Sequence, residues 1–144
     1  MPTVEVTENL SSPVEVTWRL ICDEEAYRRM GPVRSLDVLV DEGDRMTTRW
    51  EIELKGSILV WEQREHRDAL RRRIEFHQLD GDLERFDGYW QLTERPDGST
   101  DACLSVDFEI GIPMLRDMLD PVASRAIREN SRKMLLSLAP QAAS

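Results

Sequence analysis

Apolar and polar positions divide this chain into a long central region with a two-residue period and two flanking segments with a helical period. In the central region apolar residues alternate with charged ones, and short loops rich in Gly, Asp and Pro separate the alternating runs. Because loops this short join neighbouring antiparallel strands, the pattern predicts six strands in succession. They cover residues 33–40, 45–54, 58–67, 71–79, 85–93 and 101–110.

Before this region, residues 3–10 alternate as one more strand, and two short helices follow at once. Ser12 and Pro13 supply the start of the first helix, with Ser12 as its N-cap and Pro13 in its first turn. Residues 23–30 predict the second helix, which a Gly-Pro pair ends.

After the six strands, apolar residues recur along one side of a long helix from Pro113 to Leu138. We expect Met118, Val122 and Ala126 on this helix to face the sheet. The order of strand, two helices, six strands and long helix predicts an α+β fold, in which a strongly curved seven-stranded antiparallel sheet surrounds one C-terminal helix.

Length and charge narrow the possible partners. A chain of 144 residues corresponds to a single domain spanning residues 1–144. The formal net charge of −9 repels phosphate backbones and anionic lipid surfaces, which argues against nucleic acid or a membrane as partner. The first residues lack the basic and apolar regions of a signal peptide, and no apolar run approaches the ~18 residues of a membrane span. We therefore expect a cytoplasmic protein.

The segment WEQREHRD, residues 61–68, has an apolar side chain only at Trp61, although it lies in the middle of the predicted sheet. Period-two alternation puts Trp61, Gln63, Glu65 and Arg67 on one face. In a hairpin that turns at residues 68–70, apolar residues of the next strand fall on this face too, which makes it the inner one. The expected pairs are Trp61 with Gln78, Gln63 with Phe76, Glu65 with Ile74, and Arg67 with Arg72.

The sequence offers little for a metal or redox centre. Cys22 and Cys103 lie far apart without a C-x-x-C motif, so neither zinc nor a redox pair is indicated. A lone disulfide stays open, and two buried free thiols in a reducing compartment are the simpler interpretation. His66 and His77 fall on the outer face of their strands, and no phosphate loop or dinucleotide motif is present. We therefore expect neither a metal nor a cofactor.

Four segments carry a resemblance to a known superfamily: SSPVEVTWRLICDEEAY (11–27), VWEQREHR (60–67), FDGYWQL (86–92) and DGSTDACLSVDFEI (97–110). They resemble the START-like helix-grip superfamily, which includes the polyketide cyclase/dehydrase group, coenzyme Q-binding proteins and plant pathogenesis-related allergens. The resemblance covers nearly the whole chain. VWEQREHR is most similar to single-domain aromatase/cyclases, where a Trp-Glu pair precedes a His-Arg pair on a cavity-lining strand. The resemblance therefore implies a helix-grip fold with an internal cavity.

The polar residues of the inner face have two explanations. In the first interpretation they reach solvent at the hairpin end, or pair with each other or with the long helix. In the second they line a wet cavity, since ligand pockets combine apolar walls with a few polar groups. In the second interpretation Glu65 is the candidate base and Arg67 the candidate electrostatic stabiliser of an aldol cyclisation. The candidate substrate-binding residues are Trp50, Trp61, Gln63, Phe76, Gln78, Trp90 and Met118.

The resemblance implies a cofactor-independent enzyme that cyclises a poly-β-ketone, a hydrophobic or aromatic polyketide-like molecule delivered by an acyl carrier protein. The protein would act as a monomer or homodimer. Two other functions fit the same fold: a non-catalytic carrier of a quinone or lipid, and a protein-interaction module with a vestigial cavity. A lipid carrier needs an almost wholly apolar cavity, whereas a cyclase needs polar groups from the strands inside it.

Overall fold

The computed structural model describes residues 3–54, 57–110 and 116–143, with side chains at 3–53, 58–110 and 121–138. Within these residues seven antiparallel strands form one sheet in the order β1-β7-β6-β5-β4-β3-β2. The predicted succession of six antiparallel strands is therefore confirmed, and β1 joins the sheet beside β7. The strands are β1 (Thr3–Leu10), β2 (Val33–Asp41), β3 (Arg45–Leu54), β4 (Ser57–Asp68), β5 (Arg73–Gly81), β6 (Arg85–Glu94) and β7 (Thr100–Glu109).

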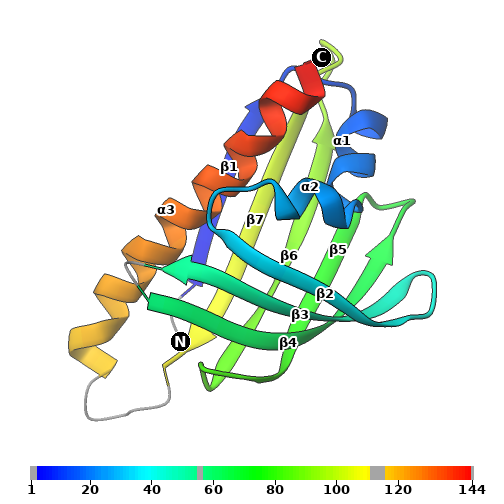
Figure 1. Cartoon of the computed structure of the whole chain (residues 1–144). Helices are drawn as coiled ribbons and strands as arrows, with labels where there is room; N and C mark the ends of the chain where they lie inside the picture. Colours follow the sequence, from blue (N-terminus) through cyan, green and yellow to red (C-terminus); the bar gives the residue numbers. More distant parts are fainter. Residues whose placement is uncertain (1–2, 55–56, 111–115, 144) are drawn as a thin grey trace.

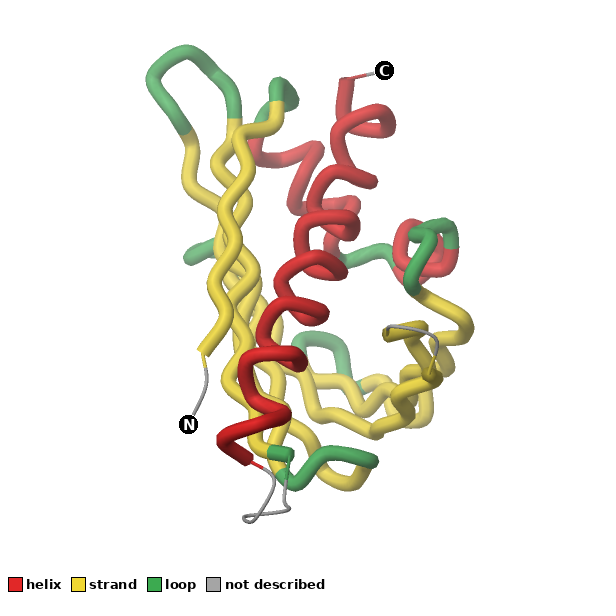
Figure 2. The backbone as a smooth tube through the Cα atoms, turned by 90° about the vertical axis from the view of Figure 1, so that its left-hand side faces the viewer, coloured by secondary structure: helices red, strands yellow, loops and turns green. Residues whose placement is uncertain are grey.

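The sheet is strongly curved, and the long helix α3 (Arg116–Ala143) lies along its concave side (Figure 1 and Figure 2). Helices α1 (Val14–Ile21) and α2 (Glu24–Arg28) follow β1; α1 lies beside α3 and β6, and α2 lies beside β2. This arrangement confirms the predicted α+β helix-grip architecture. It also places the inner faces of β3 to β7 opposite α3, where a site between sheet and helix can form.

The start of α1 differs from the prediction. Pro13 is the N-cap, and no side chain caps the helix. Instead, the hydroxyl of Ser12 is buried and forms a 2.7 Å hydrogen bond with the hydroxyl of Thr17, while its main-chain oxygen accepts from Thr100. The prediction that Ser12 caps α1 is therefore wrong, because its side chain is used to join the start of the helix to the following turn.

The register of the β4–β5 hairpin is shifted by two residues from the expected one. Residues 69–72 form the turn, Asp68 pairs with Arg73, and Arg72 takes a positive φ of 55°. A shift of two keeps every side chain on its expected face, because strand side chains alternate with a period of two. The observed inner pairs are Gln63 with Gln78, Glu65 with Phe76, and Arg67 with Ile74, and a bulge beyond Glu62 sets Trp61 opposite Gly81.

Helix α3 buries a stripe of side chains against the sheet, and the stripe begins later than expected. Ala126 is buried, as predicted, but Val122 is 60% exposed. At 3.6 residues per turn Val122 lies about 140° around the helix from the buried Ile127, on the solvent side. The predicted inward position of Val122 is therefore wrong, and the side chain of Met118 lies outside the described residues.

Candidate functional site

A partly open cavity lies between the concave face of the sheet and α3. Its volume is about 50 Å³. The sheet contributes aromatic rings from β3, β4, β5 and β6, and α3 contributes both polar and apolar side chains. The residues that line it are Trp50, Ile52, Trp61, Gln63, Phe76, Phe86, Trp90, Leu104, Val106, Ile127, Asn130, Ser131 and Met134.

This volume fits small molecules only. A site for one water needs roughly 10–15 Å³, whereas pockets for drug-sized ligands span roughly 300–1,000 Å³. A cavity of about 50 Å³ therefore has room for a few waters and not for a compound of two or three fused rings. A ligand of that size enters only if the cavity walls move apart.

The walls are a continuous set of aromatic contacts. The indoles of Trp50 and Trp61 lie nearly parallel, with an interplanar angle of 6° and centroids 5.8 Å apart. Trp61 in turn contacts Phe86 at 4.9 Å, and Phe86 stacks on Phe76 at 6.2 Å. These rings therefore form one connected aromatic cluster on the cavity wall.

Glycine at position 88 allows two of these walls to approach. A Cβ atom at Gly88 would lie 2.0 Å from the main-chain oxygen of Ser105 on β7 and 2.9 Å from the Phe76 ring. No side chain can be placed there without displacing β6 from β7. Gly88 therefore permits the close packing of Phe76 beneath β6.

Both indole N–H groups of the Trp50–Trp61 pair lead to one carboxylate. Trp61 Nε1 donates to Gln63 Oε1 at 2.7 Å, and Gln63 Nε2 donates to Glu65 Oε1 at 2.9 Å. Trp50 Nε1 donates to Thr48 Oγ1 at 2.9 Å, and Thr48 Oγ1 donates to the same Glu65 oxygen at 3.0 Å. All five residues are buried. The two rings thus depend on Glu65 for their polar anchorage.

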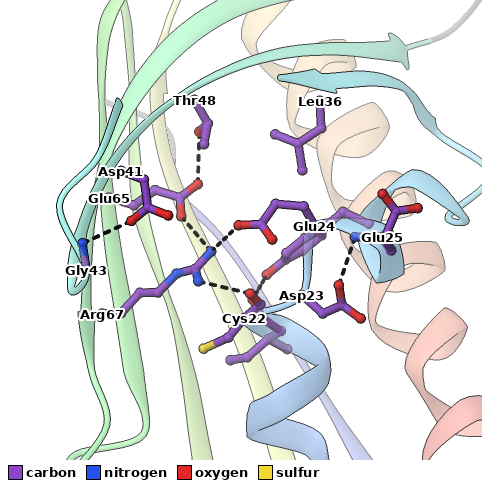
Figure 3. Close-up of polar contacts among 12 residues, drawn as sticks. Cys22, Asp23, Glu24, Glu25, Leu36, Asp41, Gly43, Thr48, Glu65 and Arg67 are labelled. Atoms are coloured by element: carbon purple, nitrogen blue, oxygen red, sulfur yellow. Dashed lines mark hydrogen bonds and ion pairs between the residues drawn. The ribbon is translucent and has the colours of Figure 1, made fainter. Parts of the chain in front are cut away.

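Arg67 pairs with the other oxygen of Glu65 and connects it to Cys22 and Glu24 in residues 22–28, called the α1–α2 segment (Figure 3). Its Nη2 lies 3.5 Å from Glu65 Oε2 and 3.4 Å from Glu24 Oε1, and its Nη1 donates to the main-chain oxygen of Cys22 at 2.9 Å. Burial lowers the pKa of Arg67, but charged neighbours led by Glu65 outweigh it, so the pKa lies above the ordinary arginine value. The guanidinium is therefore a permanent cation in this position.

Tyr27 of α2 packs against the same walls from outside the cavity. Its ring meets Trp50 edge-on at 5.2 Å and Trp90 at 5.7 Å, and its hydroxyl donates to the main-chain oxygen of Ile21. Burial, and then the charge of Glu65, raise the pKa of Tyr27 well above the ordinary tyrosine value. The phenol therefore stays protonated as a donor.

The comparisons with known proteins agree with this architecture. A family model described as polyketide cyclase / dehydrase and lipid transport matches residues 10–135, most of the chain. The chain belongs to this family. No curated protein matches it in sequence.

Solved structures of similar proteins share the fold over nearly the full length of both chains. TTHA0849 from Thermus thermophilus is 27% identical, with a TM-score of 0.90 and coverage of 98% of this chain and 97% of that one. The Zhui aromatase/cyclase from Streptomyces sp. R1128 is 22% identical, with a TM-score of 0.84 and coverage of 98% and 93%. A START superfamily protein from Mycobacterium smegmatis is 17% identical, with a TM-score of 0.82 and coverage of 97% and 96%. The expected START-like fold is confirmed.

Within this cyclase/dehydrase fold the cavity brings together five of the residues expected to bind substrate: Trp50, Trp61, Gln63, Phe76 and Trp90. Gln78 lies elsewhere, because its amide donates to the main-chain oxygen of Leu83 at 2.7 Å. The side chain of Met118 is outside the described residues.

Glu65 and Arg67 do not line the cavity, although the sequence placed them in its wall. Glu65 is 5% exposed and the side chain of Arg67 is 15% exposed, so neither is a solvated charge at the hairpin end. They pair with each other, and Arg67 turns toward Cys22 and Glu24 instead of the cavity. The strand pattern gives the face of a side chain but not the direction of its long polar end, which a tertiary contact decides here.

The residues proposed from the sequence also left out Tyr27 behind the wall and eight residues that line the cavity: Ile52, Phe86, Leu104, Val106, Ile127, Asn130, Ser131 and Met134. Phe86 and Met134 were visible as apolar residues on the inner sides of a strand and of the long helix. Asn130 and Ser131 gave no such signal, because polar residues on an amphipathic helix ordinarily face solvent.

The cysteines and histidines take no part in the cavity. Cys22 and Cys103 are free, as expected, but they are half-buried and not buried. Burial raises the pKa of Cys22 to about 11, which leaves it protonated near neutral pH. Among the described residues no group of three or more His, Cys, Asp or Glu side chains could hold a metal ion. No helix in the described part of the chain has the length and hydrophobicity needed to cross a membrane.

Proposed function

We propose that this protein binds a poly-β-ketone, or a planar aromatic product of one, in the cavity and promotes its regiospecific aldol cyclisation and dehydration without a cofactor. The observation that carries the proposal is the cavity lined by the rings of Trp50, Trp61, Phe76, Phe86 and Trp90. Flat aromatic walls favour flat ligands and restrict how a flexible chain can fold between them. Family membership supports the same reaction class.

The polar groups that line the cavity are few, and they lie on opposite sides of it. Gln63 comes from β4, and Asn130 and Ser131 come from α3. Within the described residues the Ser131 hydroxyl forms no hydrogen bond, so it can donate to a substrate carbonyl or an enolate oxygen. The indole N–H groups of Trp50 and Trp61 donate to Thr48 and Gln63, so they are not available to a ligand.

Glu65 remains the candidate base for removal of an α-proton, because it lies one hydrogen bond behind Gln63. Its oxygens already accept from Thr48 and Gln63 and pair with Arg67. It reaches a substrate only when Gln63 turns aside, and the small cavity volume likewise requires the walls to move on binding. Arg67 would hold the Glu65 carboxylate in place and would not touch the substrate itself.

A second candidate is a non-catalytic carrier of a hydrophobic aromatic molecule. The observation that favours it is the position of Glu65 and Arg67 outside the cavity wall. A carrier would bind the same ligands and leave them unchanged, whereas a cyclase would alter the products formed from a poly-β-ketone.

The test combines binding and turnover. Emodin, a planar aromatic polyketide, should quench tryptophan fluorescence saturably in the wild type and in Trp18→Phe, whose indole is on α1 outside the cavity, but far more weakly in Trp61→Leu. A reconstituted polyketide synthase should then yield more of a single cyclised product when the protein is added. Binding without any change in products would select the carrier, and absence of saturable binding would contradict both candidates.

The proposal includes a partner and a compartment. A poly-β-ketone is held on an acyl carrier protein, which would deliver it to the cavity in the cytoplasm, to a monomer or homodimer of this chain. Pull-down with an acyl carrier protein loaded with a non-hydrolysable polyketide mimic tests this step, with the unloaded carrier protein as control. Equal recovery of the loaded and unloaded forms would contradict delivery by recognition of the chain.

A further inference from the structure

The cavity walls and the α1–α2 segment (residues 22–28) are joined by one continuous series of polar contacts. It begins at the two indole N–H groups of Trp50 and Trp61, converges on Glu65 through one intermediate residue each, and continues through Arg67. Figure 3 shows its second half, from Thr48 and Glu65 to Arg67 and Cys22. A displacement of the α1–α2 segment can therefore change the orientation of the Trp50 and Trp61 rings, and the reverse also holds.

This series of polar contacts depends on Arg67. In the part of the chain that the structure describes, it is the one cation in an ion pair with Glu65. Its fork also spans two partners on the α1–α2 segment, the Cys22 oxygen and the Glu24 carboxylate. Its buried Nε has no hydrogen-bond partner among the described residues, so the guanidinium is oriented entirely by its two Nη groups.

A second, independent contact links the same two parts. Tyr27 on α2 packs edge-on against Trp50 and Trp90. The α1–α2 segment therefore supports the aromatic walls twice, once by packing through Tyr27 and once by charge through Arg67.

We propose that Arg67 is a positioning residue: it holds Glu65 in place, and through Glu65 it fixes the orientation of the Trp50 and Trp61 rings and ties the shape of the cavity to the α1–α2 segment. Without Arg67 the Glu65 carboxylate loses its cation and turns toward other donors or water. Thr48 and Gln63 then lose their shared acceptor, and both indoles can leave the parallel arrangement. The positioning role stands on the contacts alone; its effect on ligands rests on the proposed function.

The decisive readout is the indole N–H signals in ¹H–¹⁵N NMR spectra. The chain has four tryptophans, each giving one signal that a Trp→Phe variant can assign. In Arg67→Ala the signals of Trp50 and Trp61 should shift or broaden, while that of Trp18 keeps its position. The matched control is Arg64→Ala on the same strand, whose side chain faces outward and pairs with exposed Glu42. It should leave all four signals unchanged.

The conservative variant keeps the test valid if Arg67→Ala does not fold. Lys at position 67 keeps the positive charge but lacks the planar fork, so Arg67→Lys should shift the same two signals by less. Unchanged Trp50 and Trp61 signals in a folded Arg67→Ala or Arg67→Lys protein would overturn the proposal.

A second arm measures affinity for emodin by fluorescence quenching. Changes along a coupled network shift affinity by about 2- to 30-fold, so Arg67→Ala should weaken emodin binding within this range, and Arg64→Ala should not. Equal affinity in the wild type and Arg67→Ala would contradict coupling to the cavity. If the wild type does not bind emodin, the proposed function fails, while the NMR result still decides the positioning role.

Discussion

Removal of Arg67 should destabilise the protein far more than removal of another arginine from the same strand. Arg67→Ala leaves Glu65, which is 5% exposed, buried without its cation. Breaking a buried ion pair by removing one partner costs about 3–5 kcal/mol. The lost hydrogen bond to the Cys22 oxygen is part of this cost, at about 1.5–3 kcal/mol for a charged donor.

The lower end of this range applies, because the Arg67 side chain is 15% exposed and water can partly replace it. We expect a loss of ~3 kcal/mol in the free energy of unfolding, or a fall of about 10 °C in Tm. The control Arg64→Ala removes an ion pair whose side chains are 36% and 56% exposed, which is worth about 0–1 kcal/mol.

The assay is urea unfolding followed by tryptophan fluorescence and circular dichroism, with a double-mutant cycle. Glu65→Gln removes the charge that Arg67 neutralises, so the double variant Arg67→Ala/Glu65→Gln should be more stable than the sum of the single losses implies, by at least about 1 kcal/mol. A loss below about 1 kcal/mol in Arg67→Ala, or additive losses in the cycle, would refute the buried-pair reasoning.

Three further predictions follow from single contacts. Gly88→Ala should lower the free energy of unfolding in urea by about 3 kcal/mol, because its Cβ would overlap the main-chain oxygen of Ser105. The control Gly31→Ala has no atom within 4 Å of its Cβ and should not clash, so equal losses in the two variants would contradict this. Cys22, with its pKa raised to about 11, should be alkylated by iodoacetamide at pH 8 much more slowly in the folded protein than in the unfolded chain, as measured by mass spectrometry; fast alkylation of the folded protein would contradict this. The contribution of Cys22 to stability should be lost as pH rises from about 9 to about 11, which unfolding at a series of pH values measures. Tyr27→Phe should cost about 1 kcal/mol, the worth of the hydrogen bond from its hydroxyl to α1; an unchanged Tm would mean that this bond adds no stability.

Period and loop length were enough to predict the fold. Strict alternation in residues 45–54 reproduced β3 to the residue, and short loops gave the antiparallel order. The helical period gave the buried Ala126, but not the exposure of Val122, because a stripe of apolar residues on a helix is wider than the face that contacts the sheet. The hairpin register was missed by two residues, because the turn covers residues 69–72, with a positive φ at Arg72, and not residues 68–70.

The candidate site was only partly predictable. Alternation put Trp61 and Gln63 on one face, the apolar residues of the next strand identified that face as the inner one, and both residues line the cavity. The direction of Arg67 could not be read from the strand, because its partners Cys22 and Glu24 are distant in sequence, on the α1–α2 segment. Ser131 could not be found either, since a single serine on a helix carries no sequence signal of its environment.

The location of a bound planar aromatic compound tests the central claim most directly. Intermolecular NOEs between emodin and methyl groups of this protein distinguish the cavity from the surface. We expect NOEs to the methyl groups of Ile127 and Met134, which line the cavity, and none to Leu39, which is 48% exposed on β2. NOEs confined to Leu39 and other exposed side chains, with none to Ile127 or Met134, would contradict the assignment of the cavity as the binding site.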